Sequence, residues 1–279
     1  MSLSLKKRVD FLGKKNNPSS SPLPPPTHTE KPAIPIGYNL VSLMYATNVV
    51  YVSKSVYADR TKMLRDHADL VTASSSSSIF TLDDVIYGCD HEMKNKVVMI
   101  NEGAVSATAL LGVIHLVRSL SQPHLLGRNE TIKIVLDAGI GTTTTGVGLA
   151  VKILGLAWKI VAVMLGGESL KAYKNREMDL ISDFNRSYVM SHDVVCKFDS
   201  SGIVEWVERI HPRRKMEECK KISQQTGIPV DPIYTLAAWE YPVRFSQEHF
   251  PKVVMLHTGG TLGMFGLAQR YMNSFHPKP

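Results

Sequence analysis

The chain has 279 residues, 44% of them hydrophobic and 20% charged, which is typical of a globular protein with room for one large domain or two smaller ones. The formal charge of +7 is a weak signal, because the basic cluster 213–215 lies where acids and bases alternate, so we predict a solvated helix face and no nucleic-acid partner. No apolar run is long enough to span a bilayer, and the three cysteines and scattered histidines have no spacing that predicts a disulfide framework or a metal site.

Residues 1–35 are basic, poor in acids, and rich in Pro and Ser. Such a segment cannot bury a core, so we predict that it is disordered. Two interpretations of it stay open. One is a transit peptide, which would place the protein in the mitochondrion; the other is a plain flexible tail, which would leave it in the cytoplasm.

Hydrophobic periodicity predicts the elements that follow, in chain order. Helices are expected at 38–45, 58–68, 82–87, 107–120, 169–186, 201–226 (broken at Pro212) and 235–247, and strands at 48–52, 96–101 and 252–257. A strand, a turn, a helix and a further strand are expected within 131–165. Apolar strands that alternate with helices predict an α/β fold, with a parallel sheet and helices on both faces.

The most informative turn lies within that last unit, at Gly139, Gly141 and the run Thr142, Thr143, Thr144 and Thr145. It falls where a strand ends and a helix begins. The first amides of a helix have no partner within the helix and carry partial positive charge, so they bind phosphate well. Glycine permits a close approach of the backbone, and threonine hydroxyls add donors. The turn therefore predicts a phosphate site; a turn that binds nothing is the less favoured alternative.

Two familiar phosphate motifs fit this turn poorly. The P-loop needs a lysine where Val147 stands, which argues against a triphosphate site. The dinucleotide fingerprint needs a third glycine where Thr144 stands, and the next strand ends without an acidic residue. A single phosphomonoester fits better, and among cofactors pyridoxal phosphate is the natural candidate.

Three further segments accompany this turn: INEGAVSATALLG at 100–112, VDPIYTLAAW at 230–239 and VMLHTGGTLGMF at 254–265. With DAGIGTTTTGVGLA, in this order, they resemble the D-cysteine desulfhydrase and 1-aminocyclopropane-1-carboxylate deaminase family. GYNLVSLMY at 37–45 and YADRTKML at 57–64 are similar to its plant D-cysteine desulfhydrase branch. The resemblance covers about 37–270.

The resemblance implies the fold-type-II pyridoxal-phosphate architecture, a three-layer fold like that of the tryptophan synthase β subunit. Residues 36–100 would be a remnant of its small α/β domain and 101–279 its large cofactor-binding domain. The phosphate cup of the family corresponds to Gly139, Gly141, Thr142, Thr143 and Thr144. Tyr234, given a catalytic role, and Thr235 match residues beside cofactor and substrate. Thr258 matches the residue that faces the pyridine nitrogen, where a neutral hydroxyl would not hold that nitrogen protonated as a carboxylate does.

The same resemblance shows what the sequence lacks. The family's Schiff-base lysine lies in a segment upstream of the equivalent of GYNL, and nothing in this sequence corresponds to that segment. We therefore expect a family-derived chain that is truncated and, as written, poorly stable or dependent on a partner; whether it is active without that lysine stays open.

Three functions are weighed on this basis. The first is a lyase that degrades D-cysteine to pyruvate, hydrogen sulfide and ammonia; a deaminase-like activity on 1-aminocyclopropane-1-carboxylate, or on another small amino acid, stays open as an alternative. The second is a non-catalytic pyridoxal-phosphate-binding protein, and the third, given little weight, is a nucleotide-binding module. Thr235 favours a desulfhydrase over a deaminase, because the deaminases carry a glutamate there. Relatives are commonly dimeric, so a homodimer is the oligomeric state to test. His257 and Glu102 are candidate pocket residues, with structural roles as an equal alternative.

Overall fold

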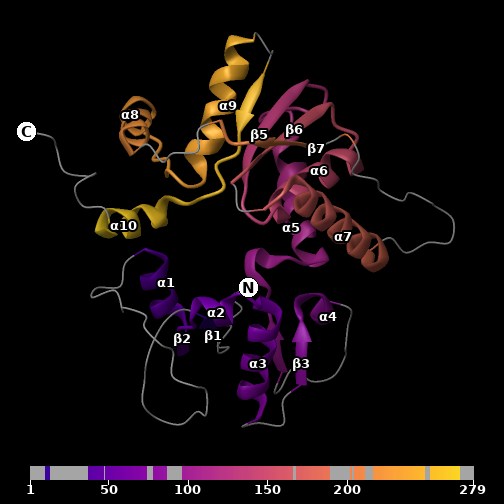
Figure 1. Ribbon diagram of the computed structural model, residues 1–279. Coiled ribbons are helices and arrows are strands. Elements are labelled where there is room, and N and C mark those ends of the chain that lie inside the picture. The colour runs from indigo at the N-terminus through magenta and orange to yellow at the C-terminus, as the bar shows by residue number, and fades with distance from the viewer. Residues whose placement is uncertain are drawn as a thin grey trace, which may run out of the picture. The chain divides into compact units, whose positions relative to one another are not determined.

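The computed structural model describes residues 10–12, 37–46, 48–73, 78–86, 96–165, 168–188, 202, 204–210, 216–248 and 252–270 (Figure 1). The chain divides into two compact units, one made of residues 1–69 and 261–279 and the other of residues 70–260. The division at residues 35 and 100, expected from the sequence, stays a prediction. Most of the segment expected to be disordered lies outside the described residues.

The first unit holds a pair of strands and several helices, drawn from both ends of the chain. Its elements are β1 (Asp10–Leu12), α1 (Tyr38–Tyr45), β2 (Asn48–Val50), α2 (Lys54–Tyr57), most of α3 (Arg60–Ala73) and α10 (Thr261–Arg270). β1 lies within the segment expected to be disordered and pairs in parallel with β2. The start of α1 lies against α10, because a Cβ at Gly37 would fall 2.4 Å from the Leu262 carbonyl oxygen.

The second unit is built on a parallel sheet of order β7-β6-β5-β8. Its strands are β5 (Ile132–Ala138), β6 (Trp158–Met164), β7 (Val204–Glu208) and β8 (Val253–Met255). Its helices include α5 (Ala107–Leu120), α6 (Thr142–Ile153), α7 (Leu170–Tyr188), α8 (Met216–Thr226) and α9 (Thr235–Gln247). β5 and β6 are joined through α6, so the βαβ unit expected within 131–165 is confirmed.

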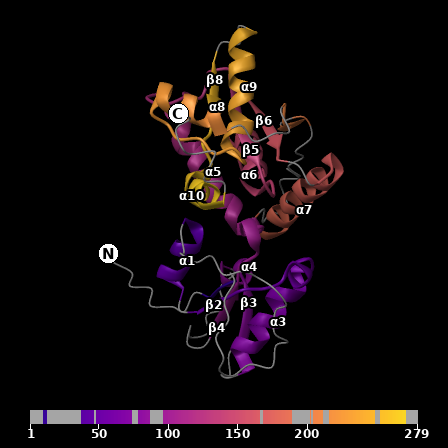
Figure 2. The same cartoon turned by 60° about the vertical axis from the view of Figure 1, so that its left-hand side comes forward.

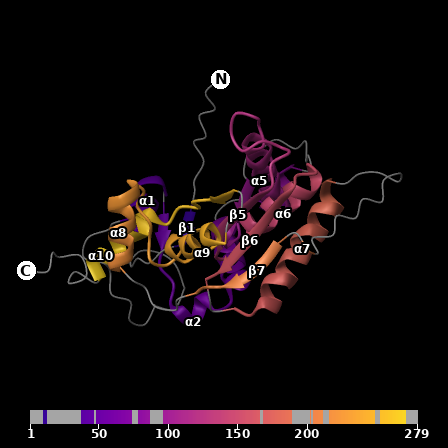
Figure 3. The same cartoon turned by 90° about the horizontal axis from the view of Figure 1, so that it is seen from above.

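The two faces of this sheet have separate cores. Ile132, Ile134 and Leu136 of β5 pack with Val117 of α5 and Val147 of α6. Val135 of β5 and its neighbours on β6 pack on the opposite face against α9. Figure 3 shows α9 on one side of the sheet and α5, α6 and α7 on the other. Because successive side chains of a strand point to opposite faces, the near-continuous apolar run of β5 serves both cores.

A smaller two-stranded parallel sheet pairs β3 (Ser78–Thr81) with β4 (Lys96–Met99), and α4 (Leu82–Ile86) lies beside it (Figure 2). Asp83 of α4 accepts a hydrogen bond of 2.9 Å from the Thr108 amide at the start of α5. Ser106 caps the same helix by accepting from the Ala109 amide. This small sheet is thereby tied to the helix that covers the main sheet.

One helix predicted from the sequence is partly wrong. Residues 204–208 form β7 in place of the first part of a helix at 201–226, and α8 begins only at Met216. Val204, Trp206 and Val207 are β-branched or aromatic residues, which favour a strand. As a strand, the segment also forms backbone hydrogen bonds with β6. Pro212, where a break was expected, lies outside the described residues. β3 was also missed, because it is only four residues long and begins with Ser78, the last residue of a serine run.

Candidate functional site

The glycine-threonine turn forms the N-terminus of α6, at the carboxyl end of the central strand β5. Gly141 is the N-cap and has φ 101°, a left-handed conformation that favours glycine. A Cβ there would also fall 3.2 Å from the Trp206 ring. The amides of the first turn of α6 have no intrahelical acceptor, so the helix presents unpaired donors and the positive end of its dipole at this edge of the sheet.

Two threonine hydroxyls in this turn are buried without a hydrogen-bond partner among the residues that the structure describes. Thr142 is 7% exposed and Thr144 is fully buried, and neither Oγ1 atom has a partner. An unmade hydrogen bond of this kind costs about 1–3 kcal/mol. A phosphate group bound at the start of α6 can accept hydrogen bonds from hydroxyls and amides of this turn. The residues present therefore fit a phosphate group; Thr143 is half-buried on the same turn.

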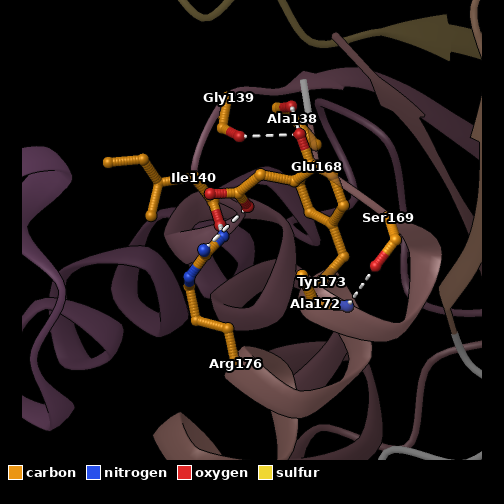
Figure 4. A network of polar contacts seen from close by, with 8 residues as sticks. All are labelled: Ala138, Gly139, Ile140, Glu168, Ser169, Ala172, Tyr173 and Arg176. Atoms are coloured by element: carbon orange, nitrogen blue, oxygen red, sulfur yellow. Dashed lines mark hydrogen bonds and ion pairs between the residues drawn. The ribbon is translucent and has the colours of Figure 1, made fainter. Parts of the chain in front are cut away.

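The backbone of the turn is held from one side by α7 (Figure 4). The Tyr173 hydroxyl donates to the carbonyl oxygens of Ala138, at 3.1 Å, and Gly139, at 2.9 Å. Arg176 donates to the carbonyl oxygen of Ile140 at 2.6 Å and forms an ion pair of 2.7 Å with Glu168. Three successive carbonyl groups are therefore fixed by two side chains one helical turn apart.

This arrangement determines where the amides of the turn point. In a trans peptide the carbonyl and the following amide point in opposite directions. The amides of Gly139, Ile140 and Gly141 are therefore directed away from α7. Burial raises the pKa of Tyr173, and the nearby Glu168 carboxylate adds to this, so its phenol remains a hydrogen-bond donor at neutral pH.

The segment at 100–112 reaches this turn directly. Gly103, with φ 67°, is so near Ile140 that an added Cβ would lie 2.8 Å from the Ile140 side chain. Gly139 approaches the ring of Tyr234, with 3.8 Å between an added Cβ and a ring carbon. Two sequence motifs far apart in the chain therefore meet the glycine-threonine turn.

Two residues of the remaining motif, Thr258 and Gly260, contact carboxylates of the same unit. The Thr258 hydroxyl forms a short hydrogen bond with a carboxylate oxygen of Asp137, at the end of β5. Gly260, with φ 92°, lies against the Asp231 carboxylate, where an added Cβ would fall 2.3 Å from an oxygen. The structure thus brings together the residues predicted for the site: Gly139, Gly141, Thr142, Thr143, Thr144, Tyr234, Thr235 and Thr258. Their individual roles stay predictions.

Tyr234 and Thr235 differ in how available they are to a ligand. Tyr234 is 40% exposed and precedes α9. Thr235 is fully buried, and its hydroxyl accepts from the Asp231 amide at 2.7 Å and donates to the Asp231 carboxylate at 2.8 Å. That carboxylate also accepts from the amides of Ile233 and Tyr234. Thr235 and Asp231 therefore build the start of α9, and only the Tyr234 side chain is left exposed.

The two further candidates occupy different surroundings. His257 is held by the backbone on both sides: one ring nitrogen contacts the Pro229 carbonyl at 3.1 Å, and the other accepts from the Gly259 amide. A structural role for His257 is thus favoured. Glu102 is exposed, in the 3₁₀ turn η1 (Glu102–Ala104).

Sequence reasoning missed Asp137, Asp231, Tyr173 and Arg176. A signal existed for the first two: Asp137 is a carboxylate next to the end of a strand that is apolar from Ile134 to Leu136, and Asp231 stands four residues before Thr235, at a helix start. Tyr173 and Arg176 share one face of α7 through their i, i+3 spacing, but nothing in the sequence indicates that this face meets a loop 35 residues earlier.

No group of His, Cys, Asp or Glu residues in the described segments is arranged to hold a metal ion. Among the helices that the structure describes, none has the length and apolar character required to cross a membrane.

Comparison with known proteins finds two curated relatives of the chain. No protein-family profile matches it. It is 45% identical over 265 residues to a protein of Oryza sativa subsp. japonica named "Putative D-cysteine desulfhydrase 2, mitochondrial", covering 88% of this chain and 64% of that one. It is 23% identical over 195 residues to a "Putative 1-aminocyclopropane-1-carboxylate deaminase" of Thermotoga maritima, covering 67% of this chain and 60% of that one.

A solved structure shows the fold. The crystal structure of an ACC deaminase homologue matches with a TM-score of 0.64 at 17% identity, covering 96% of this chain and 70% of that one. The architecture is therefore that of the fold-type-II pyridoxal-phosphate enzymes, as the sequence predicted.

These comparisons confirm the resemblance to the D-cysteine desulfhydrase and 1-aminocyclopropane-1-carboxylate deaminase family, and the rice relative is a plant protein named for desulfhydrase activity. The family is one of pyridoxal-phosphate-dependent enzymes that act on small amino acids. The chain spans 64% and 60% of the lengths of the two curated relatives.

Proposed function

We propose that the start of α6 binds the phosphate of pyridoxal phosphate. The observation that carries this proposal is the pair of buried, unsatisfied hydroxyls of Thr142 and Thr144 at a glycine-capped helix N-terminus. The carbonyl contacts of Tyr173 and Arg176 support it, because they turn the preceding amides away from α7. A nucleotide is disfavoured, since no lysine stands where a P-loop needs one.

The activity proposed for the protein to which this chain corresponds is the α,β-elimination of D-cysteine. One water is consumed, and pyruvate, hydrogen sulfide and ammonia are released. Pyridoxal phosphate, when bound, supplies the electron sink for removal of the α-proton. Of this chain's residues, the α6 turn would hold the phosphate, and the exposed Tyr234 ring beside Gly139 would face the substrate side. D-cysteine is taken from the name of the rice relative and from Thr235.

The second candidate function is pyridoxal-phosphate binding without catalysis. It rests on the phosphate-binding features of the α6 turn alone, the buried hydroxyls of Thr142 and Thr144 at a glycine-capped helix start. In this case the α6 turn would still bind the phosphate, and a partner or a second copy of the chain would share the cofactor. We propose a mitochondrial location, from the name of the rice relative and the basic segment 1–35, and a homodimer as the state to test.

One experiment separates these functions. The purified protein is incubated with pyridoxal phosphate and D-cysteine, sulfide is measured, and borohydride followed by peptide mass spectrometry identifies any lysine that bonds the aldehyde. Sulfide release with a single modified lysine supports the lyase. Phosphate-dependent binding without sulfide supports the non-catalytic function, and absence of binding refutes both. L-Cysteine serves as the matched substrate control.

A further inference from the structure

A buried carboxylate lies directly behind the hydroxyl of Thr258. Asp137 is 7% exposed and stands near the carboxyl end of β5. Its strand neighbour β8 runs parallel, with Val135 paired to Met255, so Thr258 emerges beside Asp137 three residues after β8 ends. The Thr258 hydroxyl contacts a carboxylate oxygen of Asp137, while the Thr258 residue itself is exposed. One end of this pair is therefore buried, and the other is exposed.

The protonation state of Asp137 decides the direction of that hydrogen bond. An ionised carboxylate can only accept, so the Thr258 proton must point to Asp137, and the lone pairs of Thr258 are left for a ligand. A protonated carboxyl can donate to Thr258, which frees the threonine proton for a ligand instead. A hydroxyl between a carboxylate and a ligand thus transmits the charge state of the carboxylate.

Several groups set that charge state. Burial raises the pKa of Asp137, whereas the hydrogen bond from Thr258 lowers it. The negative charge of Asp231, before α9, raises this pKa further, and His257, beside Thr258, lowers it. Burial and Asp231 thus oppose the ionised form of Asp137, whereas Thr258 and His257 favour it.

This inference rests on the proposed pyridoxal-phosphate site and on the expectation that Thr258 faces the pyridine nitrogen. We propose that Asp137 is a positioning residue which, acting through Thr258, makes that hydroxyl an acceptor and so favours the protonated form of the ring nitrogen. The chain of bonds runs from the ring N–H to the Thr258 oxygen and from the Thr258 proton to the Asp137 carboxylate. No net proton transfer is needed. Thr258 therefore favours a protonated ring nitrogen more than an isolated neutral hydroxyl would. The ring is then a stronger electron sink than the sequence alone suggested.

The test measures the ring nitrogen itself. Pyridoxine 5′-phosphate, which has no aldehyde and needs no lysine, is labelled with ¹⁵N in the ring, and its chemical shift is followed against pH when bound. The Asp137→Asn substitution is expected to lower the apparent pKa of the bound ring nitrogen by about one unit relative to the wild type, which is a tenfold weaker affinity for the proton. Thr258→Val should give the same loss without altering the buried residue, and Thr258→Ser should retain the wild-type titration.

Each outcome has one meaning. Equal titration of bound ligand in the wild type, Asp137→Asn and Thr258→Val overturns the role of Asp137, while ligand binding leaves the proposed phosphate site intact. Loss in Thr258→Val but not in Asp137→Asn also overturns it. If the wild type does not bind the labelled ligand, the proposed phosphate site itself fails, and the inference fails with it. Exposed Asp179→Asn is the control for a change of net charge and should titrate as the wild type does.

Discussion

A Thr144→Val substitution should make the ligand-free protein more stable. The hydroxyl of Thr144 is fully buried and has no partner in the described part of the chain. Valine has nearly the same shape and nearly the same helix propensity, so the exchange removes little more than the unsatisfied hydroxyl. Relief of that desolvation cost should raise the free energy of unfolding by about 1–2 kcal/mol. A stabilising mutation in a helix start would be unusual if the residue served structure alone.

The matched control is Thr235→Val, the same exchange at another fully buried helix-start threonine. Its hydroxyl is satisfied, because it accepts from the Asp231 amide and donates to the Asp231 carboxylate. The exchange leaves buried polar groups of Asp231 without these partners, so the free energy of unfolding should fall by about 1–3 kcal/mol. The two variants are therefore expected to shift in opposite directions.

Urea unfolding without ligand, followed by circular dichroism, measures both changes, and titration with pyridoxine 5′-phosphate measures binding. Thr144→Val should weaken phosphate-dependent binding roughly 10- to 100-fold, since a hydrogen bond to a charged group contributes about 1.5–3 kcal/mol. If Thr144→Val destabilises the protein as Thr235→Val does, or binds the ligand as the wild type does, the assignment of the Thr144 hydroxyl to a phosphate is wrong.

Three further predictions concern the surroundings of the site. Gly146→Ala should lower the free energy of unfolding by about 1–3 kcal/mol relative to Gly112→Ala, although both substitutions gain the same helix propensity. An added Cβ at position 146 falls 2.7 Å from the Val113 Cβ, whereas one at position 112 meets nothing within 4 Å. Thermal unfolding of both variants tests this, and equal shifts would contradict the close contact between α5 and α6. Arg176→Gln should weaken binding of inorganic phosphate severalfold, with Arg176→Lys weakened less, as measured by calorimetry; unchanged affinity in both would show that the Ile140 carbonyl contact does not position the turn. Burial raises the pKa of the Cys219 thiol to about 12, above its ordinary value of 9.0, so the folded state favours the protonated thiol and the free energy of unfolding should fall as pH rises above 9.0. Urea unfolding of Cys219→Ala should show a smaller loss of stability at alkaline pH than the wild type, and an identical pH dependence would contradict this prediction.

Much of the fold was accessible from the sequence because local and long-range signals agree there. The helices at 38–45, 107–120 and 235–247 were predicted with their observed limits, and the βαβ unit around α6 was recognised from its apolar strands and glycine turn. β7 was missed because its short segment gains its structure from β6, a partner that no local pattern reveals.

The candidate site divides in the same way. The residues at strand ends and helix starts, such as Thr144 and Thr258, carry motif signals and were predicted. The residues that hold them, such as Asp137 and Tyr173, act through contacts between segments distant in the chain, and their types are ordinary for a strand end and a helix face. Only the folded arrangement shows that they meet the motif residues.

The central claim, a phosphate cup for pyridoxal phosphate at the start of α6, is tested most directly by comparing two ligands that differ only in the phosphate. Binding of pyridoxine 5′-phosphate and of pyridoxine is measured by the quenching of protein fluorescence, with ATP as a third ligand. The account predicts that the phosphate ester binds at least about 100-fold more tightly than pyridoxine, and more tightly than ATP, since the charge-assisted bonds to phosphate are lost without it. Equal affinity for the ester and pyridoxine, or tighter binding of ATP, would contradict it.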